Sequence, residues 1–209
     1  MWRLISTFAA VAWLAVAAIG TATAQPDVDP SELLQPGPLA EHALGDPDAP
    51  VTIVAYVSLT CHHCEAFHNN VWPALKEKFV DTGKVRFILR EFPFDTPGAA
   101  GAMLARCAKE NWHTVVDLLF RNADSWAHSN RPLNALADLV RQAGMDRQAF
   151  EQCLSDQALL QAIEAAQKHA HEKFGVRATP TFFVNGRRHV GALGLAQLEQ
   201  MIEAAEPAR

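Results

Sequence analysis

Two cysteines separated by two residues, in the sequence Cys61-His62-His63-Cys64, are the strongest chemical signal in the chain. A cysteine thiolate is the nucleophile of thiol–disulfide exchange, but a free cysteine with a pKa of about 8.5 is mostly protonated at neutral pH. A loop this short is of little use as a structural cross-link, so the spacing favours redox chemistry. We interpret Cys61 and Cys64 as a redox pair in which Cys61 is attacked and Cys64 resolves the mixed disulfide.

The surrounding residues predict how Cys61 is activated. The apolar run Val51–Val57 indicates a buried strand, and a helix is expected to begin near Cys61. Unpaired N–H groups and the helix dipole favour negative charge at a helix N-terminus. His62 and His63 can add hydrogen-bond donors or positive charge, whereas His68 is interpreted as an ordinary helix residue. A lowered pKa of Cys61 would stabilise the reduced form and make the disulfide a stronger oxidant.

Two other interpretations of this motif stay open. It could be part of a zinc or copper site completed by His62, His63 or His68, because thiolates and imidazoles suit these metals. It could also be a purely structural bridge. The sequence has no second pair of cysteines at this spacing, so we favour the redox pair and expect neither a bound metal nor a cofactor.

Thr179-Pro180 is a second candidate site, at the head of an apolar strand. Proline cannot donate to a sheet ladder, so its presence there needs a reason. A cis peptide bond is one reason. A trans proline that only marks the start of the strand is the alternative.

The elements that must position these residues follow from the apolar pattern. The strand at 51–57, a helix after Cys61 and a second strand at 84–92 predict a βαβ unit with parallel strands. Pro73 interrupts the apolar face of the helix and is expected to kink it. After the helical stretch at 98–174, Asn185-Gly186 predicts a β hairpin. The order indicates an α/β fold, one sheet with helices around it and an inserted helical block.

The N-terminal residues have the pattern of a cleavable secretory signal peptide. Arg3 precedes an apolar stretch from Leu4 to Ile19, and Ala22-Thr23-Ala24 fits the rule for cleavage after small residues. A retained membrane anchor is the alternative, but the run is short for a span and no basic cluster follows it. We predict export of a mature chain that starts at Gln25.

The charge balance argues against nucleic acid as a partner. The chain has 18 lysines and arginines against 23 acidic residues, a net charge of −5. Nucleic-acid binding requires a basic footprint, which this composition does not supply.

Cys107 and Cys153 lie 46 positions apart in the helical block. We interpret them as a structural disulfide between two helices, because export places them where disulfides persist. Two alternatives remain, a pair of buried free thiols and a second redox pair.

Three segments carry a resemblance to the DsbA-like periplasmic disulfide oxidoreductases, which are thioredoxin folds with an inserted helical domain. They are LGDPDAPVTIVAYVSLTCHHC, GKVRFILREFPF and GVRATPTFFVNGRRHVGA, in the right order. The resemblance implies that Thr179–Pro180 is a cis peptide that faces the cysteines and binds the substrate backbone, and that Cys61 carries the mixed disulfide. It also implies that a quinone-linked membrane oxidase reoxidises the protein. We expect a periplasmic monomer that acts on unfolded or reduced exported polypeptides.

Two positions depart from the family pattern. His62 replaces the proline that the family often has between its cysteines, and Ala55 stands where thioredoxin-like proteins bury an acid. Both positions influence the direction of exchange. A dithiol oxidase that introduces disulfides is the favoured function, with a reductase or isomerase and a copper- or zinc-binding protein as alternatives.

The sequence thus predicts four kinds of segment. We expect a signal peptide at 1–24, a flexible leader at 25–38, a thioredoxin-like domain at 39–97 and 175–209, and an inserted helical subdomain at 98–174.

Overall fold

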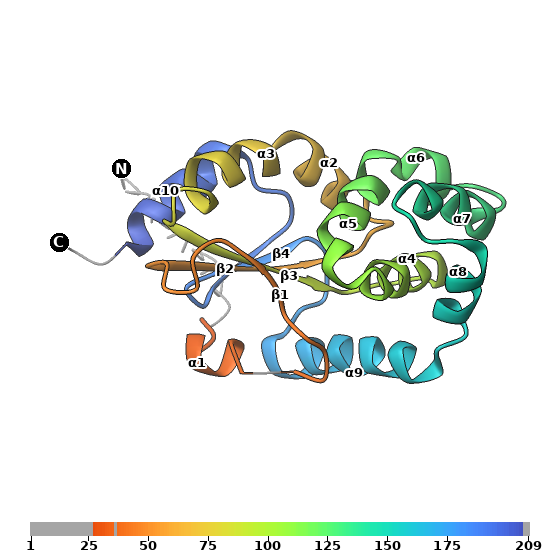
Figure 1. The fold of residues 1–209 in the computed structure, drawn as a ribbon. Helices are drawn as coiled ribbons and strands as arrows, with labels where there is room; N and C mark the ends of the chain where they lie inside the picture. The colour runs from red at the N-terminus through yellow and green to blue at the C-terminus, as the bar shows by residue number, and fades with distance from the viewer. Residues whose placement is uncertain (1–26, 36, 207–209) are drawn as a thin grey trace, which may run out of the picture.

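A computed structural model of the chain describes residues 27–35 and 37–206 (Figure 1). The expected signal peptide at 1–24 and its cleavage site lie outside these residues. No helix within the described ranges has both the length and the hydropathy that crossing a membrane requires.

A five-stranded sheet lies at the centre of the molecule, with the strand order β1-β3-β2-β4-β5. β2 and β3 are parallel, as the βαβ pattern predicts, and the other neighbouring pairs are antiparallel. The edge strand β1 was not predicted, because three residues with no apolar alternation carry no strand signal of their own. The strands are β1 His42–Leu44, β2 Val51–Val57, β3 Val85–Glu91, β4 Thr181–Val184 and β5 Arg187–Val190.

The helix that follows the cysteine motif is broken as the proline predicts. α2 (His62–Asn70) ends before α3 (Trp72–Leu75), and a π-helical turn at Lys76–Val80 continues the element. Pro73 lies in the first turn of α3 and has no N–H to donate to the carbonyl of Asn69. The break divides the element into a short helix that begins at the cysteines and a second segment that leads to β3.

Successive residues of β2 point to opposite faces of the sheet and so belong to two separate cores. Ile53, Ala55 and Val57 contribute to a core that also contains residues of α2, α3, the helical block and α10 (Leu195–Ala205). Val54 and Tyr56 contribute to the second core, on the opposite face. Figure 1 shows α2, α3 and α10 above the sheet and α1 and α9 below it.

Six helices and one 3-10 turn fill the segment between β3 and β4. The last of them serves two cores, because Ile163 packs within the helical block while Ala170 and Phe174 cover the lower face of the sheet. The helical block is therefore tied directly to the sheet. Its elements are α4 Thr96–Cys107, a 3-10 turn Lys109–Asn111, α5 Trp112–Arg121, α6 Ala123–Trp126, α7 Pro132–Gln142, α8 Arg147–Leu154 and α9 Gln157–Phe174.

The hairpin between β4 and β5 turns at the predicted residues. Asn185 and Gly186 both have positive φ angles, 44° and 86°, which glycine and asparagine tolerate best. Asn185 also accepts a hydrogen bond from the backbone N–H of Thr52, at 2.7 Å, so the turn is fixed to the start of β2.

Residues 27–35 differ from the flexible leader that the sequence predicts over 25–38. α1 (Pro30–Leu33) is capped by Asp29, whose side chain accepts a hydrogen bond from the N–H of Ser31. Leu33 is 2% exposed and packs in the lower core, and the N–H of Val28 donates to the carbonyl of Gly186 at 2.9 Å. The capped helical turn and the buried Leu33 hold this segment against the lower core. The proline and acidic residues of the segment predict a flexible chain because they give no sign of this contact.

Candidate redox site

Cys61 lies at the point where the loop after β2 meets α2. It is the N-cap residue of α2, and its N–H donates to the carbonyl of Ser58 at 3.1 Å. Cys61 is partly exposed, while Cys64, one helical turn later, is fully buried, and both are free thiols. One partly exposed and one buried sulfur is the arrangement that the spacing predicts.

The loop before Cys61 is held by the start of the helical block. The hydroxyl of Thr60 donates to Oδ2 of Asp95 at 2.9 Å, and Oδ1 of Asp95 accepts from the N–H of Gly98 at 2.7 Å. Asp95 is the N-cap of α4, so one carboxylate both caps a helix and fixes the residue before the cysteine. The Asp-Thr-Pro sequence is a recognisable helix start, but its contact with the cysteine loop depends on the tertiary fold.

The loop before β4 lies directly against Cys61. The Thr179–Pro180 peptide bond is cis, and the Cys61 thiol donates to the carbonyl of Thr179 at 3.2 Å. The loop is fixed on both sides, since Thr181 Oγ1 donates to the carbonyl of Ala178 at 2.6 Å. The fold therefore brings together residues that are 118 positions apart in the chain.

The two thiols have opposite electrostatic environments. Hydrogen bonds from the Cys64 thiol, from the Thr179 side chain and from the backbone N–H groups of Cys64 and His63 lower the pKa of Cys61 from 9.0 to about 5, against the effect of partial burial. The Thr179 carbonyl favours the protonated thiol, but the donors at the helix start outweigh it. Burial, followed by the hydrogen bond with Cys61 and its negative charge, raises the pKa of Cys64 far above its ordinary value. Cys61 is thus a thiolate at neutral pH and Cys64 a thiol.

His62 and His63 occupy the exposed surface of the first turn of α2. Nδ1 of His62 lies 3.5 Å from Glu65, and the His62 side chain is 78% exposed. Of the two, the described structure shows only His63 acting on Cys61, through its backbone N–H. Both side chains are exposed at the start of the helix that carries the two cysteines.

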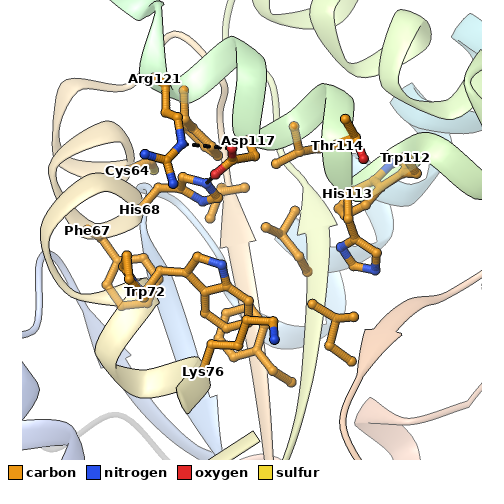
Figure 2. Close-up of a pocket in the computed structure, with 17 residues that line it drawn as sticks. Cys64, Phe67, His68, Trp72, Lys76, Trp112, His113, Thr114, Asp117 and Arg121 are labelled. Carbon is orange, nitrogen blue, oxygen red and sulfur yellow. Dashed lines mark hydrogen bonds and ion pairs between the residues drawn. The ribbon is translucent and has the colours of Figure 1, made fainter. Parts of the chain in front are cut away.

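His68, which the sequence suggested was an ordinary helix residue, has a polar partner on another element (Figure 2). It is 7% exposed, its Nε2 lies 3.1 Å from Oδ1 of Asp117 in α5, and its ring stacks on Phe120. Oδ2 of Asp117 accepts from Nε of Arg121 at 2.7 Å. His68 and Cys64 also line one cavity of about 480 Å³ between α2, α5 and the sheet. The only sequence signal for this group is the spacing of four between Cys64 and His68.

The cysteine motif does not form a preassembled metal site. Within residues 27–35 and 37–206, no three His, Cys, Asp or Glu side chains converge closely enough to hold a metal ion. His62 turns toward Glu65, and His68 is engaged by Asp117.

The other two cysteines are joined in the structure. Cys107, the last residue of α4, forms a disulfide with Cys153 of α8, with the two Cα atoms 6.1 Å apart. This bond connects two helices of the helical block, the role that the sequence analysis favoured for the pair.

Comparison with known sequences gives one family and a set of relatives. The sequence model of the family described as Thioredoxin matches residues 39–204. A relative from Rickettsia bellii that bears the name protein-disulfide oxidoreductase is 31% identical over 145 residues, which are 68% of this chain and 56% of the relative. A Rickettsia typhi relative with the same kind of name is 32% identical over 145 residues, 68% of this chain and 54% of that one. The chain spans a little over half the length of the curated relatives it matches.

Solved structures resemble the chain over more of its length. Wolbachia pipientis alpha-DsbA1 has a TM-score of 0.78 and 35% sequence identity, and the match covers 86% of this chain and 96% of that one. A protein-disulfide isomerase from Novosphingobium aromaticivorans has a TM-score of 0.72 and 26% identity, with 80% and 98% of the two chains covered. These matches confirm the predicted fold class, a thioredoxin fold with an inserted helical block, and the resemblance to DsbA-like proteins.

Proposed function

Because this chain belongs to the thioredoxin family, we propose that it is a thiol–disulfide oxidoreductase that introduces disulfides into exported polypeptides through Cys61 and Cys64. The observation that carries the proposal is the position of Cys61 at the start of α2, where its pKa falls to about 5. A stabilised thiolate favours the reduced pair, and a pair that is more stable when reduced is a stronger oxidant. The direction of exchange is therefore oxidation of the substrate.

The proposed reaction takes two electrons from a substrate dithiol. A substrate thiolate attacks Sγ of oxidised Cys61, the substrate–Cys61 bond forms, and the Cys61–Cys64 bond breaks. Cys64 leaves with the electron pair and takes up a proton, as its raised pKa requires. A second substrate thiolate then attacks the substrate sulfur, which forms the new disulfide and releases Cys61 as a thiolate. No cofactor is needed in either step.

A polypeptide substrate fits the surface around Cys61. Phe94 is 56% exposed and precedes Asp95, which binds the residue before Cys61. We propose that the substrate backbone lies along Thr179 and Pro180, with Phe94 as an apolar contact. The exposed imidazoles of His62 and His63 would contact the substrate on the other side of the thiolate. The proposed site then consists of the six residues predicted from the sequence, which are Cys61, His62, His63, Cys64, Thr179 and Pro180.

The proposal also concerns location and partners. We propose a periplasmic monomer that is reoxidised by a quinone-linked membrane oxidase. The signal-peptide pattern at 1–24 supports export. The disulfide between Cys107 and Cys153 supports an oxidising compartment, because such bonds are rare where thiols are kept reduced.

The test is the oxidation of a reduced dithiol peptide by the oxidised protein, together with the reduction potential of Cys61 and Cys64. We expect stoichiometric peptide oxidation and a potential nearer to that of a strong oxidant, about −120 mV, than to that of thioredoxin, about −270 mV. Cys61→Ser should abolish the reaction. A potential close to the thioredoxin value would contradict the proposed direction and favour a reductase or isomerase.

A further inference from the structure

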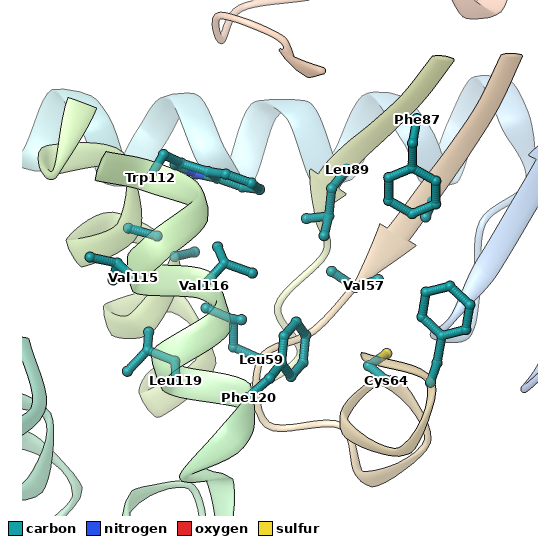
Figure 3. Close-up of a cluster of buried hydrophobic side chains, with 14 of the residues drawn as sticks. Val57, Leu59, Cys64, Phe87, Leu89, Trp112, Val115, Val116, Leu119 and Phe120 are labelled. Carbon is teal, nitrogen blue, oxygen red and sulfur yellow. The ribbon is translucent and has the colours of Figure 1, made fainter. Parts of the chain in front are cut away.

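The burial of Cys64, the proposed resolving cysteine, hinders proton transfer to and from its sulfur. Cys64 must take up a proton when it leaves as a thiolate and lose one when it attacks a mixed disulfide. It is fully buried, at 0% exposure, among apolar neighbours that include Val57, Leu59 and Phe120 (Figure 3). Ala55 of β2 belongs to the same buried cluster as Cys64, and its side chain has no ionisable group that could exchange a proton with the sulfur. Apart from its hydrogen bond with Cys61, this sulfur can exchange a proton through the cavity that Cys64 lines.

We propose that His68 carries the proton that the Cys64 thiol gains and loses during disulfide exchange, an inference that rests on the redox function proposed above. Cys64 and His68 lie four positions apart in α2 and so share one face of the helix. Both line the same cavity of about 480 Å³. A cavity of this size has room for water, which can connect two groups that do not touch.

The partners of His68 give it the properties that this role needs. The carboxylate of Asp117 accepts from Nε2–H, which leaves Nδ1 with the lone pair that receives a proton. Proton uptake then creates an imidazolium next to a carboxylate, and loss of the proton returns the neutral ring. Burial lowers the pKa of His68 below its ordinary value, although Asp117 opposes the shift. The ring is therefore neutral at neutral pH and ready to accept the Cys64 proton.

Other ionisable groups around this cavity are less suited to the task. Arg121 and Lys76 are each paired with a carboxylate, Arg121 with Asp117 and Lys76 with Asp81. Glu65 does not line the cavity, and its Oε2 lies 3.5 Å from Nδ1 of His62. His113 lines the cavity from α5, but it is not on the helix that carries Cys64. His113 thus provides a matched control, an imidazole in the same cavity without the proposed role.

The experiment separates the two sulfurs by following the reduced protein after mixing with oxidised glutathione. Cys61 first forms a mixed disulfide and releases one glutathione; Cys64 then attacks and releases the second. Acid quenching and mass spectrometry give the rate of each step as a function of pH. In His68→Gln we expect the first step to stay within about twofold of the wild type. The second should fall about 100-fold at neutral pH, a typical contribution of a positioned proton carrier.

The pH profile and chemical rescue distinguish proton transfer from a structural effect. The wild-type second step should level off once His68 is neutral, whereas in His68→Gln it should keep rising with hydroxide concentration. Added imidazole should restore the rate in His68→Ala, where the cavity can admit the ring. Asp117→Asn, which keeps the imidazole, should move the levelling point to lower pH, and His113→Gln should match the wild type.

Two outcomes would overturn the inference. A second step in His68→Gln with the wild-type rate and profile would mean that water alone carries the proton. A slow His68→Ala that imidazole does not rescue would assign His68 a packing role only. A wild-type protein whose Cys61 fails to react with oxidised glutathione would instead contradict the proposed function, so the two failures are distinguishable.

Discussion

Cys61 and Cys64 are chemically identical residues three positions apart, yet the fold gives them opposite protonation states. Cys61 lies at the helix start, where it receives hydrogen bonds from N–H groups and from Cys64, while Cys64 points into an apolar core. The difference makes one sulfur a good nucleophile and good leaving group at neutral pH. It also makes the other dependent on proton transfer, the role that we propose for His68.

The first prediction concerns the thiolate of Cys61. In the reduced protein, ultraviolet thiolate absorbance should show a single transition with a midpoint at a pH of about 5, because hydrogen bonds at the helix start stabilise the charged form. Cys61→Ser should remove the transition. A midpoint near the ordinary value of 9.0 would show that the helix start does not stabilise this thiolate.

The same pKa shift predicts how the stability of the reduced protein depends on pH. The pKa of Cys61 is about 5 when folded against 9.0 as its ordinary value, so the unfolded state binds more protons between these limits. The stabilisation is therefore fully present above the upper limit and is lost as the pH falls toward the lower one. Denaturant unfolding of Cys61→Ser, which lacks the thiolate, provides the baseline. The stability advantage of the reduced wild type over this variant should shrink steadily from alkaline to acidic pH, and a constant difference would contradict the assignment.

At the scale of elements, a buried ion pair joins the sheet to the helical block. Glu91, at the end of β3, is 6% exposed; its Oε2 lies 2.6 Å from Nη2 of Arg106 in α4. Its Oε1 accepts from Nε1 of Trp112 in α5 at 3.2 Å. Arg106 also donates to the carbonyl of Ala40, at 3.0 Å, so one side chain connects three segments of the chain. The contact with Trp112 also holds α5, the helix that forms one wall of the cavity lined by Cys64.

Removal of one partner from this pair should be costly. Arg106→Met leaves the Glu91 carboxylate buried without its cation, and we expect a loss of about 3–5 kcal/mol in the free energy of unfolding. The control is Arg147→Met, because Arg147 and Glu151 form an exposed pair, 67% and 61% exposed, in which a change of less than about 1 kcal/mol is expected. Urea unfolding measures both, and equal effects in the two variants would show that burial does not set the strength of the Glu91 pair.

The sequence predicted those elements whose signals are local. The β2–α2–β3 unit, the break at Pro73 and the Asn185-Gly186 turn each follow from the propensities of adjacent residues. The strand β1 and the docking of Leu33 were missed, because each depends on a partner distant in sequence, β3 for the strand and the lower core for the leucine. A local residue pattern does not show which distant segments will be in contact.

The candidate site shows the same division. The redox interpretation of Cys61 and Cys64 follows from their spacing and from the strand and helix predicted on either side of the motif. The contact of Cys61 with Thr179 was expected only through the family resemblance, since 118 positions separate the two residues. The pairing of His68 with Asp117 depends on how α2 packs on α5, and no residue pattern predicts it.

At the scale of the whole molecule, the helical block and the upper face of the sheet share one hydrophobic core. Leu136 and Phe150 of the block belong to the same buried cluster as Ile53 and Phe87 of the sheet. Because the two parts have no separate cores on this face, they should fold and unfold together. We therefore expect the disulfide between Cys107 and Cys153 to stabilise the entire protein through the helical block.

Replacement of both cysteines, Cys107→Ala with Cys153→Ala, tests this view. A loop of 46 residues predicts a loss of up to about 4 kcal/mol from the free energy of unfolding, since the cross-link restricts the unfolded chain. Unfolding should remain a single transition by fluorescence and circular dichroism, because the helical block and the upper face of the sheet share one core.

The rate at which Cys61 reacts with oxidised glutathione should not change, since the bond joins α4 to α8 and neither cysteine contributes to the pKa of Cys61. Mass spectrometry of the non-reduced wild type must show the cross-linked peptides. Two separate transitions in the variant would mean that the block is an independent domain, and an altered Cys61 rate would mean that the second disulfide acts on the redox site.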